Sequence, residues 1–213
     1  VFGGILNLRG DSAGMAFVSD LFAGMIIYQA FTESAARAPK LVLSRPNYVT
    51  KVAFPLHLLP WPVVIQAAIN AAISTTLLLL LHLAFVGVPA WTSVLLPVAL
   101  IPALLLGLGV SWVLASLGVY VRDTADITKV VLQLTFFMSP IVWPISTIEN
   151  ATAQFVVLLN PLAVAMEWSR SLIHGTPGPG AVWIAAFLTT TFLATACGYA
   201  FFRRTKDGFA DVL

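Results

Sequence analysis

Long apolar stretches, separated by short polar breaks, occupy most of this chain. A membrane-spanning α-helix needs about 20 mainly apolar residues, and five stretches reach that length: 16–36, 61–88, 91–120, 128–148 and 181–202. Residues 1–8 resemble the end of a further span, so we expect about six spanning helices in the full subunit, with the first mostly missing here. Backbone groups in lipid must be hydrogen-bonded within the protein, which predicts an all-α integral membrane bundle.

Lysine and arginine are divided unevenly between the two sides that these spans define. When the basic carboxyl terminus is placed in the cytoplasm, nine of the eleven fall on that side. Only Arg9 and Arg170 fall on the other. Because positive residues collect on the cytoplasmic side of membrane proteins, we expect a multi-pass protein of the cytoplasmic (inner) membrane with a cytoplasmic carboxyl terminus. Residues 37–60 and 120–128 are then cytosolic loops, and residues 149–180 are an outer region.

The composition agrees with a membrane protein and argues against several other classes. The chain is 59% hydrophobic and 9% charged, whereas a soluble domain carries about a quarter charged residues. A net charge of +2 is too small to indicate nucleic-acid binding. The single cysteine, Cys197, excludes an internal disulfide and lies in an apolar run, as a small buried hydrophobe does. We predict one transmembrane domain over 1–213, without a metal site.

The predicted cytosolic loop 37–60 is the longest polar break in the chain. Pro46 predicts the start of a short helix, because proline suits the first helical turn. Pro55 and Pro60 predict its end and the return of the chain to the membrane. On the residues alone, this helix either lies on an anionic lipid surface or docks a cytosolic partner.

The stretch 128–148 combines aromatic side chains with two prolines. Pro140 and Pro144 interrupt the helical hydrogen bonds and free backbone carbonyl groups, which lipid does not satisfy. This segment should therefore face the bundle interior or a water-filled path. Phe136, Phe137 and Trp143 then either stack on sugar rings or pack between helices, and we add Tyr28 of the first stretch to this hypothetical substrate path.

The predicted outer region contains a motif of its own. Asn160 and Pro161 are followed by Glu167 and Arg170, which are spaced to form an i,i+3 pair on a short helix. Such a helix either lies at the surface or re-enters the membrane. The glycine- and proline-rich residues 175–180 predict a tight turn before the last span.

Three segments carry a family resemblance by their order: Val121-Arg122-Asp123, the run 132–144 and Asn160-Pro161. With these segments, the chain resembles the membrane subunits of ABC-2-type transporters that export polysaccharides or polyol phosphates. The inner loop is similar to the family pattern Asn-x-(Ile/Val)-x-Lys-x-x-Phe-Pro. The residues that match it here are Asn47, Val49, Lys51, Phe54 and Pro55. Thr50 stands where the family often has a second lysine, and Val121 replaces the usual aromatic residue.

The resemblance implies the partners and several residue roles. It implies that Asn47, Tyr48, Lys51, Phe54, Arg122 and Asp123 couple this chain to a separate ATP-binding cassette subunit. That subunit would bind ATP and Mg²⁺, while this chain would bind no cofactor and would not be an enzyme. Asn160, Pro161 and Arg170 would form an outer gate of short re-entrant helices. Two copies of the chain would enclose a path for a lipid-linked glycan, surrounded by membrane lipids.

Three alternatives share some of these features. An ABC-2 exporter of a drug or lipid has the same fold, and the sequence separates it only by its aromatic residues and its Ser-Pro-Ile element. A secondary transporter needs ionisable groups near mid-bilayer, and the centres of the five stretches have none. An intramembrane aspartyl enzyme needs two facing acids, and only Asp20 lies at a suitable depth.

Overall fold

The computed structural model describes residues 12–50 and 54–211, and throughout these two ranges the regular structure is helical. The long helices are α2 (Ser12–Arg37), α4 (Trp61–Phe85), α5 (Leu96–Tyr120) and α9 (Ala181–Thr205). The shorter ones are α3 (Pro46–Thr50), α6 (Thr124–Met138), α7 (Ala151–Leu158) and α8 (Pro161–His174). The described residues also form five 3₁₀ turns: η1 (Ala38–Lys40), η2 (Leu56–Leu58), η3 (Trp91–Leu95), η4 (Ile145–Thr147) and, after the last helix, η5 (Lys206–Asp211). The prediction of an all-α membrane bundle is confirmed.

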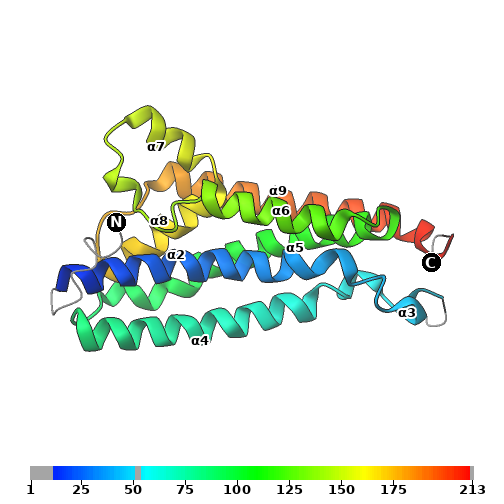
Figure 1. Ribbon diagram of the computed structural model, residues 1–213, viewed down its shortest axis with the longest axis horizontal. Coiled ribbons are helices and arrows are strands. Elements are labelled where there is room, and N and C mark those ends of the chain that lie inside the picture. The colour runs from blue at the N-terminus through cyan, green and yellow to red at the C-terminus, as the bar shows by residue number, and fades with distance from the viewer. Residues whose placement is uncertain (1–11, 51–53, 212–213) are drawn as a thin grey trace.

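The long helices run side by side along the molecule, with α3 and the carboxyl terminus at one end and α7 and α8 at the other (Figure 1). Helix α5 packs against both α9 and α2, and α2 also packs against α4. Close approach of α5 and α9 depends on glycine, since a Cβ atom on Gly109 would lie 2.6 Å from the Ala194 carbonyl oxygen. Small residues allow helices in lipid to pack this tightly.

The prediction that residues 128–148 form a single spanning helix is wrong. Helix α6 ends at Met138, and Ser139 is extended, with φ −100° and ψ 143°. A residue before proline is pushed out of the helical region, so Pro140 ends the helix. At 1.5 Å per residue, α6 is about 22 Å long, which is less than the roughly 30 Å of a hydrocarbon core.

The number of spans changes accordingly. Within the described residues, four helices are long and apolar enough to cross a membrane, or five if the bent pair α7–α8 counts as one. Helices α7 and α8 meet at 105°, a bend that fits a broken span as well as a re-entrant loop, so the re-entrant outer helices stay a prediction. Helix α8 ends at Gly175, whose φ of +67° is left-handed and therefore suits glycine.

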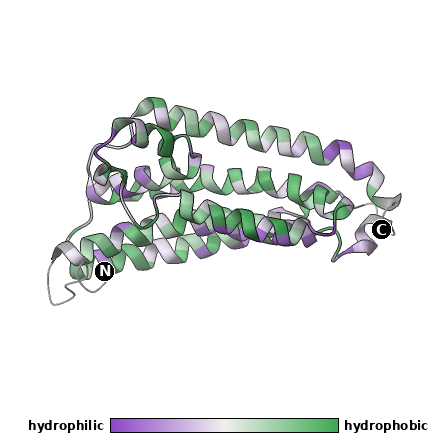
Figure 2. Cartoon of the chain, turned by 45° about the horizontal axis from the view of Figure 1, so that its top comes forward, coloured by the Kyte–Doolittle hydropathy of each residue, from purple (hydrophilic) through white to green (hydrophobic). Residues whose placement is uncertain are grey.

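Positive charge collects at the end of the bundle that holds α3 and the carboxyl terminus, which we call the basic end. Figure 2 shows hydrophilic positions on α9 beside the carboxyl terminus, where Arg203 and Arg204 lie in the last turn. Among the described lysine and arginine residues, only Arg170 belongs to the α7–α8 end. Arg9 and Lys51 lie outside the described residues. The cytoplasmic location of the basic end stays a prediction.

Candidate functional site

A buried arginine organises the α7–α8 end. The Arg170 side chain is 5% exposed. Its Nε donates to the Asp20 carbonyl at 3.1 Å, and one terminal nitrogen donates to Glu167 at 2.7 Å. The other terminal nitrogen donates to the carbonyl oxygens of Pro140 and Ile141, both at 2.8 Å. We call this set of contacts the Arg170 junction.

The junction occupies the place where α6 is broken. Carbonyl groups beyond a proline break have no helical donor, and leaving them unpaired in a water-free region costs free energy. The planar guanidinium group carries five N–H donors and does not lose its charge, so one side chain satisfies both Pro140 and Ile141. The predicted i,i+3 pair with Glu167 is present in the structure, and it balances the buried charge. Helix α8 is thereby joined to α2 and to the chain after α6.

A second connection joins the start of α8 to the end of α6. Asn160 caps α8, because its side-chain oxygen accepts from the Leu162 amide at 3.0 Å. Its amide nitrogen donates to the Ser139 hydroxyl at 2.9 Å, and that hydroxyl donates to the Thr135 carbonyl at 2.8 Å. Pro161 fills the first helical position, where its missing N–H has no cost. The three residues expected at an outer gate, Asn160, Pro161 and Arg170, therefore all lie in α8 or at its cap.

Several residues of the junction carry no clear signal in the sequence. Gly24 of α2 makes room for the guanidinium group, because a Cβ atom there would lie 2.9 Å from an Arg170 nitrogen and 3.2 Å from the Ile141 carbonyl oxygen. Asp20 contributes a backbone carbonyl, which any residue type carries. The predicted Glu167–Arg170 spacing, the freed carbonyl groups expected at Pro140 and the outer gate implied by the resemblance all pointed to this part of the site.

Two histidines extend the polar contacts to α4. The Asp20 carboxylate and His174 Nε2 are 2.7 Å apart. The His82 ring lies 5.4 Å from the His174 ring, and His82 Nδ1 is 2.9 Å from the Ser19 hydroxyl. These contacts connect α2, α4 and α8 close to the Arg170 junction.

A pocket of about 400 Å³ opens beside the Arg170 junction. It lies between α7, α8 and the turn before α9, and both polar and apolar side chains line it. Its lining includes Asp20, Gln154, Glu167, Arg170, His174 and Thr176.

The aromatic residues proposed for the substrate path do not form one group. The Tyr28 and Phe136 rings meet edge to face at 5.3 Å, and the Tyr28 hydroxyl donates to the Leu132 carbonyl at 2.6 Å. Phe137 contacts Phe136 at 5.5 Å but is itself 71% exposed. Trp143 lies beyond the α6 break, and none of the described ring contacts joins it to the other three. Phe136 thus packs into the bundle, while Phe137 points away from it.

The residues proposed for coupling lie at the basic end. The predicted short helix is present as α3, which begins at Pro46. Tyr48 is exposed, and its ring lies 4.9 Å from that of Phe54. Asn47 is exposed beside them, whereas Lys51 lies outside the described residues. Asn47 and Tyr48 are therefore open to a partner, whereas Phe54 is half-buried against a cluster of buried hydrophobic side chains.

The second loop at the basic end is a single turn between α5 and α6. Arg122 and Asp123 are exposed there, and Asp123 caps α6 without a side-chain hydrogen bond. Lys129 donates to Asp126 at 2.7 Å, and this hydrogen bond holds the pKa of Asp126 below its ordinary value. Lys40 of η1 lowers that pKa further, though less. The two cytosolic loops that were predicted are therefore neighbours in space.

Comparison with known proteins agrees with this arrangement. The chain matches the family described as ABC-2 type transporter over residues 1–174. It is 29% identical over 192 residues to the O-antigen export system permease protein RfbA of Myxococcus xanthus, covering 90% of this chain and 74% of that protein. It is 23% identical over 196 residues to the protein of the same name from Klebsiella pneumoniae, covering 91% of this chain and 74% of the relative.

The resemblance seen in the sequence is thus confirmed for the family. The family match spans most of the chain, including α2, α4, α5 and the whole Arg170 junction. The apolar helices show a multi-pass membrane protein. With its short α6 and its bent pair α7–α8, this chain belongs to the ABC-2 type transporter family.

Proposed function

We propose that this chain is the membrane-spanning subunit of an ATP-driven exporter of a lipid-linked polysaccharide, such as an O-antigen, a capsular polysaccharide or a teichoic acid. Two copies enclose the polymer path across the cytoplasmic membrane. A separate ATP-binding cassette subunit meets the basic end on the cytoplasmic side, where it binds ATP and Mg²⁺. The names of the relatives, O-antigen export permeases, support a carbohydrate cargo.

The observation that carries the transport mechanism is the position of α6 between the two ends. Helix α6 begins at the turn of Arg122 and Asp123 and ends at the carbonyl groups that Arg170 holds. A push on that turn by the partner subunit acts along a short rigid helix directly on the Arg170 junction. Allosteric coupling of this kind needs an element with two arrangements. The two arrangements are the Arg170 junction as formed here and the same junction released.

The aromatic residues give the path its contact with sugar. Exposed aromatic faces accept the apolar C–H edges of a sugar without fixing one register, which suits a polymer that must slide. Phe137 and Trp143 are therefore the residues whose replacement by alanine should lower export while the protein still assembles. If export is unchanged in both variants, these side chains only pack.

Deletion of the gene in its own organism tests the proposal. We expect the surface polysaccharide to disappear and its lipid-linked precursor to accumulate inside the cell, with both effects reversed by the intact gene. Co-purification should recover an ATP-binding subunit with two copies of this chain. Unchanged surface polysaccharide, together with the loss of a drug or lipid export activity, would assign the chain to a different ABC-2 cargo.

A further inference from the structure

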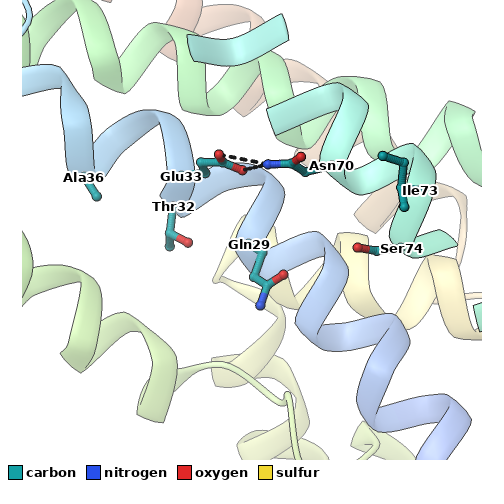
Figure 3. Close-up of a pocket in the computed structure, with 7 residues that line it drawn as sticks. All are labelled: Gln29, Thr32, Glu33, Ala36, Asn70, Ile73 and Ser74. Atoms are coloured by element: carbon teal, nitrogen blue, oxygen red, sulfur yellow. Dashed lines mark hydrogen bonds between the residues drawn. The ribbon is translucent and has the colours of Figure 1, made fainter. Parts of the chain in front are cut away.

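A polar groove runs between α2 and α4 on the outside of the bundle. It has a volume of about 490 Å³, and its lining residues are Gln29, Thr32, Glu33, Ala36, Asn70, Ile73 and Ser74. Figure 3 shows Glu33 of α2 and Asn70 of α4 pointing toward each other, with Gln29 and Thr32 beyond Glu33 on the same helix. We call this surface the polar groove.

The polar groove reaches far into the predicted membrane-spanning part of the bundle. Helix α4 starts at Trp61 at the basic end, so at 1.5 Å per residue Ser74 lies about 20 Å along the helix. Gln29 lies about 12 Å from the end of α2 at Arg37 by the same measure. A hydrocarbon core is about 30 Å thick, so these polar side chains lie at depths where lipid would otherwise surround them.

The charge in the groove is already balanced. The Glu33 carboxylate accepts from Arg37 at 3.2 Å and from the Asn70 amide at 3.0 Å through both of its oxygens. Arg37 also donates to Gln66 at 2.8 Å. The Glu33 carboxylate would repel an anion, and a cation would have to compete with Arg37 for that carboxylate. The groove therefore favours a neutral ligand.

Two polar groups in the groove are unused by the protein. Within the described residues, neither the Gln29 amide nor the Ser74 hydroxyl has a hydrogen-bond partner. Thr32 donates to the Tyr28 carbonyl at 2.9 Å, which leaves its oxygen free to accept. Unpaired amide and hydroxyl groups are costly in lipid, so this face meets water or a polar ligand.

The lining of the groove includes four neutral polar residues, and neither Tyr28 nor Phe136 of the proposed path is part of that lining. Tyr28 precedes Gln29 on α2, and its ring packs against Phe136 of α6. A sugar unit carries neutral hydroxyl groups, and the lining of this groove offers neutral amide and hydroxyl groups that can bond them. On the basis of the proposed function, we infer that the polar groove is a water-filled subsite that hydrogen-bonds the hydroxyl groups of neutral sugar units in the exported polymer.

Water access is tested by cysteine labelling in inverted membrane vesicles that hold the intact exporter. The native thiol of Cys197 is exposed, so Cys197→Ser is made first and all further variants carry it. Gln29→Cys and Ser74→Cys are then compared with Leu188→Cys and Leu193→Cys, which replace exposed apolar residues of α9. A charged, membrane-impermeant thiosulfonate reacts with the thiolate, which forms in water. The groove cysteines should react and the α9 cysteines should not; groove cysteines that react no faster than those of α9 would overturn the inference.

Sugar binding is tested in the same vesicles with and without the polymer. Vesicles from cells that make the lipid-linked polymer should label the groove cysteines roughly fivefold more slowly than vesicles from cells in which its synthesis is blocked, as expected for occupancy worth one hydrogen bond or more. Equal rates would overturn the glycan subsite even if water enters the groove. The gene-deletion experiment tests the export function separately. If the labelling rates are equal while export depends on the gene, only the glycan subsite is rejected and the proposed function stands.

Export by amide variants supplies an independent measurement. Gln29→Leu combined with Ser74→Ala should lower surface polymer several-fold, while Gln29→Asn should retain most of it because an amide remains. The control is Thr189→Val on α9, whose hydroxyl donates to the Ala185 carbonyl of its own helix and to no other described residue. Full export by the double variant would contradict a binding role for the groove.

Discussion

The two ends of the bundle hold their charged side chains in opposite ways. At the basic end, the Lys129 and Asp126 side chains are paired yet 65% and 80% exposed, and Arg204 is exposed as well. At the α7–α8 end, the Arg170 side chain is 5% exposed and has four hydrogen-bond acceptors. Exposed ion pairs add little stability, whereas breaking a buried pair is costly.

This difference teaches how the molecule divides its tasks. A surface of exposed charges can adapt to a partner protein, because no internal contact fixes its geometry. A buried arginine that satisfies two freed carbonyl groups permits only one arrangement of α2, α6 and α8. The basic end is therefore suited to docking, and the Arg170 junction is suited to holding one state until it is displaced.

The largest expected effect comes from removing the buried charge. Arg170→Ala leaves the carbonyl groups of Pro140 and Ile141 without their donor. The Glu167 carboxylate keeps the first backbone amide of η4 as a donor but loses the charge that balances it. We therefore expect a loss of about 3–5 kcal/mol in the free energy of unfolding. Thermal unfolding of the purified protein in lipid nanodiscs measures this. Arg204→Ala at the basic end is the matched control, with an expected change of at most about 0.5 kcal/mol. Equal stability of the two variants would remove the contrast between the ends.

A smaller effect is expected from crowding the junction without removing its charge. Gly24→Ala places a methyl group 2.9 Å from an Arg170 nitrogen, and overpacking of this kind costs about 1–3 kcal/mol. Gly14→Ala in the same helix has no atom within 4 Å of the new methyl group. That control should be neutral or slightly stabilising, because alanine favours helix over glycine. A stable Gly24→Ala protein would show that the junction tolerates displacement.

At the basic end, we expect a change in coupling rather than in stability. Phe54→Ala removes the ring that packs on Tyr48, so the loop loses the contact that positions it against the ATP-binding subunit. Export should fall while ATP hydrolysis by the complex continues and the membrane level of the protein is unchanged. Leu43→Ala, which changes an exposed apolar residue at this end, should leave both activities intact. Normal export by Phe54→Ala would remove Phe54 from the coupling surface.

The smallest effect concerns the exposed ion pair. The pKa of Asp126 is lowered by Lys129, so any stability from the pair is present above the ordinary carboxyl pKa and is lost as the pH falls through the lowered value. Because both side chains face water, we expect Asp126→Asn to have the same unfolding midpoint as the parent at neutral pH. A clear fall in that midpoint would mean that the basic end also depends on internal charge pairs.

The sequence by itself determined the membrane class, the long apolar helices and the short helix that starts at Pro46. Hydropathy acts over a window of neighbouring residues, and proline favours a helix start through contacts within one turn, so both can be seen without a fold. The same counting of apolar residues failed for 128–148, because it does not register that a helix ends where Ser139 precedes Pro140.

Only the tertiary structure decided which groups meet. Arg170 bonds a carbonyl of Asp20, 150 positions away in the chain, and Glu33 meets Asn70 across two helices. Of the two adjacent rings, Phe136 packs half-buried against Tyr28, while Phe137 is exposed. These outcomes depend on how the helices pack against one another. Patterns of neighbouring residues in a sequence carry no information about contacts between residues that are far apart in the chain.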